Sequence, residues 1–288
     1  MITLQNDALR VTIASKGAEL QNIFSKETEI EYLWNGDAAF WPRRSPVLFP
    51  IVGSVKNDTY IYKEKEYSLP RHGFARDMEF AEEKISETEA VYTLTDTVAT
   101  LPVYPFPFML RLLYSLKGKV VYCTYEVTNP GREELLFSIG AHPAFAVPLD
   151  QATQYDDYYL QWSTPEPLER WIQEGGLSNM TTEAVKTDNG RLSLKHSLFY
   201  DDAIVLKNLK SNTISIGSTK HTHGIHFSFD NFPFFGIWAS KDAPFVCLEP
   251  WCGITDNTTH NQQLVDKEGI IKLAPGGAWE RGWGVECF

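Results

Sequence analysis

The chain has 288 residues, a formal net charge of −11 and a hydrophobic content of 43%. It has no basic tract longer than a pair of residues, so nucleic acids and anionic membranes are not expected as partners. The 17 Phe, 13 Tyr and 8 Trp favour β-strands, and aromatic rings of this kind also stack on the apolar faces of sugars.

The N-terminal segment 1–7 has no basic region followed by an apolar run, so no signal peptide is expected. No apolar stretch approaches the roughly 20 residues of a membrane-spanning helix. Cys123, Cys247, Cys252 and Cys287 have no CxxC spacing, which is typical of reduced thiols. We therefore expect a cytoplasmic protein.

Apolar and polar residues alternate along many short segments, as they do in half-buried β-strands. One short helix is expected within 258–265, and an irregular surface loop is expected over the polar, turn-rich stretch 164–195. No linker or internal repeat divides the chain, so residues 1–288 are predicted to form a single all-β domain of antiparallel sheets packed face to face. In chain order, the alternation predicts strands at 9–13, 60–63, 91–94, 120–127, 135–139, 204–206, 213–216, 225–229 and 245–248.

The first candidate site residue is His72, which lies between Arg71 and Gly73 and four residues before Arg76. With Arg43 and Arg44, four arginines fall in two aromatic, Pro-containing loops of an acidic protein. Such clustering suggests a site for an oxygen-rich ligand. The alternative is a solvated surface cluster with a capping histidine.

His142 and Glu249 are the other two candidates for proton transfer. His142 follows a predicted strand in the sequence Gly-Ala-His-Pro-Ala-Phe, where small neighbours let a ligand approach closely. Glu249 continues an apolar strand, so we expect it to be buried, with a pKa raised toward the range useful for a base. A core histidine and a structural ion pair are the respective alternatives.

Other polar residues give weaker signals. Asp201 or Asp202, just before the strand at 204–206, could accept hydrogen bonds from hydroxyl groups or could belong to a turn. His221 and His223 share one strand face, but no further donor completes a familiar zinc spacing, so no metal site is predicted. The chain has no GxSxG, P-loop or GxGxxG motif, which disfavours nucleophile-elbow hydrolases, P-loop NTPases and Rossmann dehydrogenases.

Taken together, these segments resemble the aldose 1-epimerase (galactose mutarotase-like) family, and within it the bacterial LacX-like branch. Each motif is weak by itself, whereas their order and spacing are fairly specific. The resemblance covers nearly the whole chain and is carried by the segments 17–23, 31–34, 41–50, 71–76, 140–145, 202–205 and 248–251.

This resemblance implies a β-supersandwich of large antiparallel sheets with an open cleft on a concave face. It implies that Glu249 is the base acting on the anomeric hydroxyl, that His142 is the acid acting on the ring oxygen, and that His72 assists. It further implies that Arg44 and Asp202 hold substrate hydroxyls. We add Arg71, Arg76 and Trp251 as candidate sugar contacts.

The predicted reaction interconverts the α and β anomers of a hexose such as glucose or galactose. It needs no cofactor, because neither a redox change nor a group transfer occurs. A small-molecule sugar is then the expected partner, and the chain is expected to be a monomer or homodimer. The alternatives are a hexose-6-phosphate mutarotase, which the HGFAR segment at 72–76 also suggests, a non-catalytic sugar-binding or sensor protein, and a two-carboxylate glycosidase.

Overall fold

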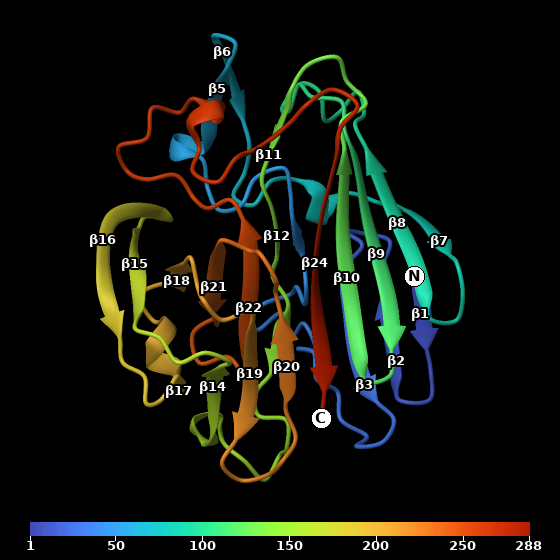
Figure 1. Ribbon diagram of the computed structural model, residues 1–288, viewed down its shortest axis with the longest axis vertical. Helices are drawn as coiled ribbons and strands as arrows, with labels where there is room; N and C mark the ends of the chain where they lie inside the picture. Colours follow the sequence, from blue (N-terminus) through green and yellow to red (C-terminus); the bar gives the residue numbers. More distant parts are fainter.

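A computed structural model describes all residues 1–288, and two large antiparallel sheets dominate it (Figure 1). The nine-stranded sheet comprises, in spatial order, β17 (Arg191–Ser193), β14 (Tyr158–Trp162), β19 (Thr213–Ser218), β20 (Ile225–Ser228), β24 (Ala278–Cys287), β10 (Val120–Thr128), β9 (Met109–Lys117), β8 (Glu89–Thr95) and β7 (Ala81–Lys84). The eight-stranded sheet comprises β16 (Leu177–Val185), β15 (Leu168–Glu174), β18 (Ile204–Lys207), β21 (Phe234–Trp238), β22 (Phe245–Cys252), β12 (Ile139–Ala141) and β4 (Val47–Leu48), with β13 (Ala144–Ala146) also paired to β22.

Smaller elements complete the fold. They are the three-stranded sheet of β1 (Ile2–Gln5), β2 (Leu9–Ile13) and β3 (Leu20–Ser25), the pair β11 (Leu135–Phe137) with β23 (Ile271–Leu273), and the pair β5 (Thr59–Tyr62) with β6 (Lys65–Ser68). The helical content consists of five 3₁₀ turns, η1 (Lys56–Asp58), η2 (Ala75–Asp77), η3 (Tyr155–Asp157), η4 (His196–Phe199) and η5 (Leu264–Asp266). None of these turns has the length or apolar character needed to span a membrane.

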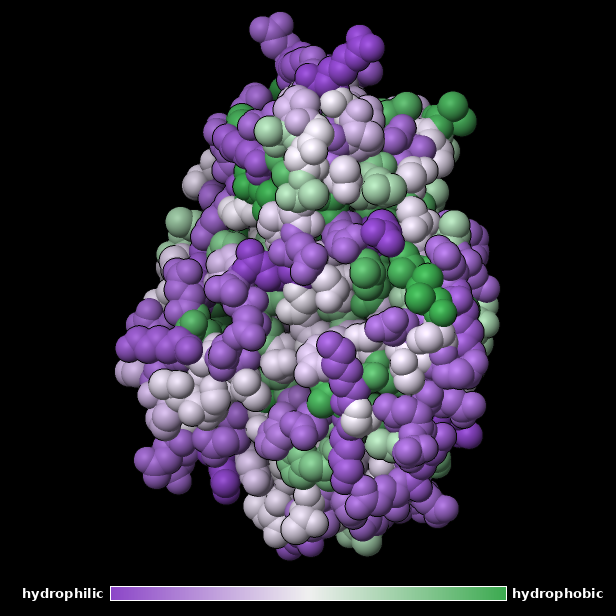
Figure 2. Space-filling model, turned by 45° about the vertical axis from the view of Figure 1, so that its right-hand side comes forward, coloured by the Kyte–Doolittle hydropathy of each residue, from purple (hydrophilic) through white to green (hydrophobic).

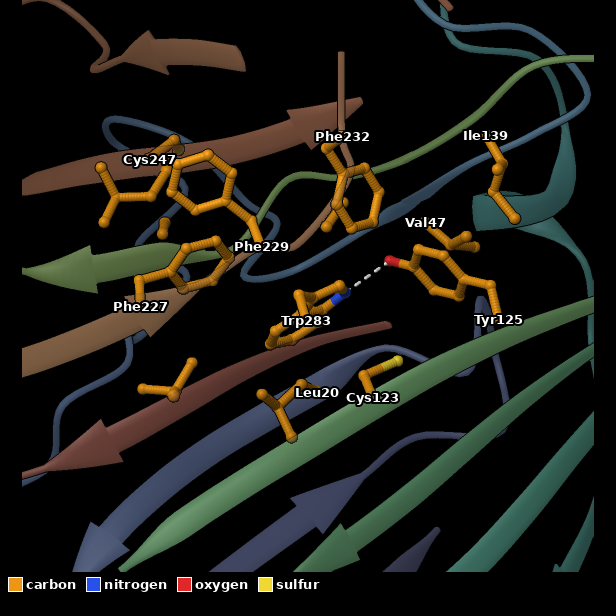
Figure 3. Close-up of a cluster of buried hydrophobic side chains, with 14 of the residues drawn as sticks. Leu20, Val47, Cys123, Tyr125, Ile139, Phe227, Phe229, Phe232, Cys247 and Trp283 are labelled. Carbon is orange, nitrogen blue, oxygen red and sulfur yellow. Dashed lines mark hydrogen bonds between the residues drawn. The ribbon is translucent and has the colours of Figure 1, made fainter. Parts of the chain in front are cut away.

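One apolar core of 70 buried residues joins the sheets. Figure 3 shows part of it, where Phe227 and Trp283 of the nine-stranded sheet stack with ring centroids 5.6 Å apart and Cys247 of the eight-stranded sheet belongs to the same core. The Trp283 indole N–H donates to the Tyr125 hydroxyl at 2.9 Å, which satisfies two buried polar groups within the apolar surroundings. The all-β supersandwich of large antiparallel sheets is therefore confirmed.

One face of the molecule is drawn in space-filling form in Figure 2. The face shown in Figure 2 is largely hydrophilic, with only small, separate hydrophobic patches. This agrees with the acidic composition and with the burial of most aromatic side chains.

The helix expected within 258–265 is wrong. Apart from the 3₁₀ turn η5, this stretch has no helical structure. The side chain of Asn257 accepts the backbone N–H of Thr259 at 2.9 Å, and Asn261 likewise accepts that of Gln263 at 2.9 Å. These local bonds compete with helix formation.

The surface loop expected over 164–195 is also wrong, because β15 and β16 form a hairpin there. Gly175 and Gly176 make its turn, both with positive φ (60° and 81°), as the favoured two-residue hairpin turns require. Much of β16 is exposed and polar, so the hydrophobic alternation that marks a strand is missing from its sequence.

Candidate active site

A cavity of about 230 Å³ opens beside the eight-stranded sheet. It is lined by side chains from segments that lie far apart in the sequence, namely Trp41, Arg71, His72, Arg76, His142, Asp202, Ala203, Trp238, Glu249 and Trp251. The three predicted proton-transfer residues therefore lie in one cavity. Arg71, Arg76, Asp202 and Trp251 lie there with them.

Glu249 and Trp251 are two residues apart on β22, so the alternation of the strand places both on the cavity side. The broad ring of Trp251 fits because two glycines on the neighbouring strands lie against it. A Cβ atom at Gly140 of β12 would lie 2.6 Å from the Trp251 ring, and one at Gly236 of β21 would lie 2.4 Å from it. The two glycines thus make the space that the cavity wall requires.

His142 follows β12 directly, and its Nε2 lies 3.1 Å from Oε2 of Glu249. Both side chains are nearly inaccessible, with exposures of 10% and 2%. Oε2 of Glu249 has no hydrogen-bond partner, so Nε2 of His142 is close to this oxygen but not in the geometry of a hydrogen bond. The pair is free to engage a ligand.

Burial controls the protonation of this pair. It raises the pKa of Glu249 well above its usual value, while Arg71 and Trp251 act in the opposite direction. Burial also lowers the pKa of His142 to about 3, and the nearby arginines contribute to the lowering. Both effects favour uncharged side chains, a carboxylic acid beside a neutral imidazole.

His142 lies in an aromatic enclosure. Trp41 stacks on its ring at a centroid distance of 4.9 Å, and Trp238 meets it edge-on at 5.6 Å. Neither tryptophan was predicted to belong to the site. Trp41 begins the segment 41–50 that carries the family resemblance, whereas the only signal for Trp238 was the abundance of aromatic residues. The contacts themselves depend on the folding of separate segments.

His72 has a left-handed backbone conformation, with φ of 69°, which is uncommon for a residue other than glycine. The Gly53 N–H donates to its Nδ1 at 3.1 Å, so in the neutral ring the proton is assigned to Nε2. Nε of Arg71 lies 3.3 Å from this Nε2, and we interpret that approach as a contact between two donors. Burial, together with nearby His142 and Arg71, lowers the pKa of His72 well below its usual value, so it offers an N–H donor.

Only one of the two candidate aspartates, Asp202, lies in the cavity. Asp202 lines the cavity, and its Oδ1 accepts the backbone N–H of Ala203 at 2.7 Å. Asp201 lines a different surface hollow, together with Arg170 and Lys186.

Arg44 does not line the cavity. Its guanidinium donates to the carbonyl of Gln21, and its backbone N–H donates to Glu19 at 2.7 Å. The structure therefore does not bring Arg44 to the other predicted sugar contacts.

Comparison with known proteins agrees with this arrangement. The family model for aldose 1-epimerase matches residues 1–281. The plasmid-encoded protein LacX of Lactococcus lactis subsp. lactis is 35% identical over 284 residues, which is 95% of each chain.

Solved structures of relatives share the fold over their whole length. The galactose mutarotase related enzyme from Lactobacillus acidophilus superposes with a TM-score of 0.96 at 32% identity, covering 100% of this chain and 97% of that one. A galactose mutarotase-like protein from Lactobacillus casei gives 0.94 at 32% identity, covering 100% of both chains. The chain belongs to the aldose 1-epimerase family.

Proposed function

We propose that this protein is a mutarotase that interconverts the α and β anomers of a hexose by opening and closing the sugar ring. The observation that carries the proposal is the buried pair of Glu249 and His142, whose carboxyl oxygen and imidazole nitrogen lie 3.1 Å apart in the wall of a cavity of about 230 Å³. Anomerisation needs a base at the anomeric hydroxyl and an acid at the ring oxygen of the same hemiacetal.

In the proposed mechanism, Glu249 takes the proton from O1 while His142 gives a proton to O5. The C1–O5 bond breaks, and the electron pair of the O1–H bond forms the C1=O1 carbonyl of the open-chain aldehyde. Rotation about C1–C2 presents the other carbonyl face, and the two groups exchange roles when the ring closes. Each positioned proton transfer contributes on the order of 10²–10⁴-fold.

The electrostatics of the pair determine which state of this cycle is favoured. Ring opening starts with carboxylate and imidazolium and ends with carboxylic acid and neutral imidazole. The raised pKa of Glu249 and the lowered pKa of His142 both favour the second state. The free pair must therefore first pass its proton from Glu249 to His142, which burial disfavours, and ring opening then returns the pair to the favoured state. The pair holds one proton in total at every stage, so no net exchange with solvent is needed.

The remaining cavity residues are assigned to binding. The Nε2–H of His72 and the guanidinium of Arg71 are donors for sugar oxygens, and Asp202 is an acceptor. Trp251 offers an aromatic wall, as do Trp41 and Trp238. No group in this scheme requires a cofactor.

A hexose 6-phosphate is the second candidate substrate, and one observation favours it. Arg76 lines the cavity, and its buried Nε has no hydrogen-bond partner, although the Asp77 carboxylate lies 3.8 Å away. Burial and the charge of Arg43 lower the pKa of the Arg76 guanidinium, so an anionic group there would relieve repulsion between the arginines.

Polarimetry tests the proposal. Catalytic amounts of protein are added to freshly dissolved α-D-glucose, α-D-galactose or glucose 6-phosphate, and the approach of optical rotation to equilibrium is followed. We expect acceleration in proportion to protein concentration. Binding without acceleration would instead identify a sugar-binding protein.

A further inference from the structure

A third potential metal-binding group lies beside the Glu249–His142 pair. Cys247 precedes Glu249 by two residues on β22, and a ligand atom from each of Cys247, His142 and Glu249 lies within 4.8 Å of the other two. All three residues are buried, and Oε2 of Glu249 has no hydrogen-bond partner. The mutarotase mechanism makes no use of the thiol.

The three groups have rigid supports. Cys247 and Glu249 belong to the same central strand, and Cys247 pairs with Ala144 of β13, two residues after His142. Cys247 also belongs to the apolar core drawn in Figure 3 and is not among the residues that line the cavity. An ion entering through the cavity would meet His142 and Glu249 first and the sulfur behind them.

The donor set and its dimensions suit zinc. Zinc binds thiolate sulfur at about 2.3 Å and imidazole nitrogen or carboxylate oxygen at about 2.0–2.2 Å, which places the ligand atoms of a tetrahedral site roughly 3–4 Å apart. The His142 and Glu249 atoms are already 3.1 Å apart, so mainly the sulfur has to approach. Imidazole and thiolate also select zinc over magnesium or calcium.

We propose that His142, Cys247 and Glu249 form an inhibitory site for Zn²⁺, with the fourth coordination position facing the cavity. The ion replaces the thiol proton, which leaves to solvent, and no oxidation or reduction takes place. It occupies the imidazole nitrogen and the carboxylate that would otherwise transfer protons to sugar. Metal binding itself does not depend on the proposed function, whereas inhibition rests on it.

The surrounding charges set the strength of this site. A thiolate and a carboxylate balance the double charge of the ion, and Asp202 adds a further negative group on the cavity wall. Arg71 and Arg76 line the same wall and oppose cation binding. We therefore expect reversible binding, weaker than that of closed structural zinc sites, and removal of the metal by EDTA.

Cobalt gives a direct readout that needs no catalytic activity. Co²⁺ is added to the metal-free protein, and the near-ultraviolet thiolate-to-cobalt band and the visible bands of tetrahedral cobalt are recorded. We expect both in the wild type, displacement of Co²⁺ by Zn²⁺, and loss of the thiolate band in Cys247→Ser. Cys252→Ser, on the same strand, is the matched control and should retain the band. Cys247→Ala replaces the serine variant if the latter does not fold, as judged by thermal melting.

Anomerase activity gives the second readout. For each protein, activity with Zn²⁺ is divided by the same protein's activity without it, and Mg²⁺ is the metal control. We expect the Zn²⁺ concentration for half-inhibition to rise by at least about tenfold in Cys247→Ser. Losing a residue that only hydrogen-bonds to a metal ligand already weakens metal binding by about tenfold or more, and loss of a ligand itself should weaken it further. Absence of a thiolate–cobalt band in the wild type, or its persistence in Cys247→Ser, would overturn the proposal. A cobalt band from a protein that turns over no sugar would contradict the mutarotase function alone.

Discussion

The indole of Trp41 stacks on the imidazole of His142, with centroids 4.9 Å apart and an interplanar angle of 29°. Trp238 closes a second side, so the orientation of His142 is set by aromatic packing rather than by hydrogen bonds. Its Nδ1 is in fact buried without a partner. The ring is therefore held firmly, while its protonation depends mainly on burial and on the groups in the cavity.

We expect His142→Asn to lower kcat strongly with little change in KM. The asparagine keeps a polar side chain in the enclosure but cannot donate a proton to the ring oxygen as an imidazolium does. Steady-state polarimetry gives both constants. A rise in KM at unchanged kcat would identify His142 as a binding residue.

Glu249→Gln is expected to lower kcat by about 10²-fold or more while the fold is kept, because the amide cannot accept the O1 proton. Burial raises the pKa of Glu249, so the wild-type protein loses stability as rising pH ionises this side chain. Glutamine cannot ionise, so the variant should not show that loss. Thermal melting serves as the folding control. A variant retaining more than about a tenth of the wild-type kcat would place the base elsewhere.

The sequence predicted much of the fold because alternation records which face of a strand is buried. Strand β2 matches its prediction, and β10 extends one residue beyond it. The hairpin β15–β16 was missed because β16 is mostly exposed and has no such alternation.

The site was predicted less completely than the fold. His72, His142 and Glu249 were identifiable from their local contexts, and the resemblance indicated that they act together. The stacking of Trp41 on His142 and the turning of Arg44 toward Gln21 depend on contacts between distant segments. No local pattern records such contacts.

The lowered pKa of His142 predicts a specific dependence of stability on pH. Between pH 6.5 and about 3, the unfolded chain binds a proton at this histidine that the folded chain does not. The stability associated with neutral His142 is thus complete above pH 6.5 and is lost as the pH falls toward 3. We expect Tm to fall more between pH 7 and pH 4 in the wild type than in His142→Asn. Glu249 is present in both proteins, so parallel curves would contradict the assignment.

Gly236→Ala tests whether the glycines at 140 and 236 are needed to make room for the ring of Trp251. The added methyl group would lie 2.4 Å from the indole ring, so the ring or the strand must move. We expect a loss of stability of about 1–3 kcal/mol and a lower kcat/KM. Gly282→Ala on β24 is the control, because the nearest atom to its Cβ is the Thr124 hydroxyl at 3.1 Å. If the two variants have the same stability in denaturation and the same kcat/KM in polarimetry, a glycine at 236 is not needed to accommodate Trp251.

The role of Arg71 and Arg76 can be tested by comparing free and phosphorylated hexoses as substrates. If Arg71 and Arg76 contact only hydroxyl groups, free glucose and galactose should be turned over at least as well as glucose 6-phosphate, and we expect this outcome. A phosphate pocket would instead give the phosphorylated sugar a higher kcat/KM, and salt would weaken that preference by screening a partly exposed contact. The measurement is kcat/KM for the three sugars at low and high ionic strength, with Arg76→Ala as the test variant. Arg191→Ala is the control, because Arg191 lies over Tyr159, outside the cavity lining. The opposite outcome is a preference for glucose 6-phosphate of about tenfold or more, which corresponds to about 1.4 kcal/mol in transition-state binding. If that preference disappears in Arg76→Ala but not in Arg191→Ala, the substrate is the hexose phosphate.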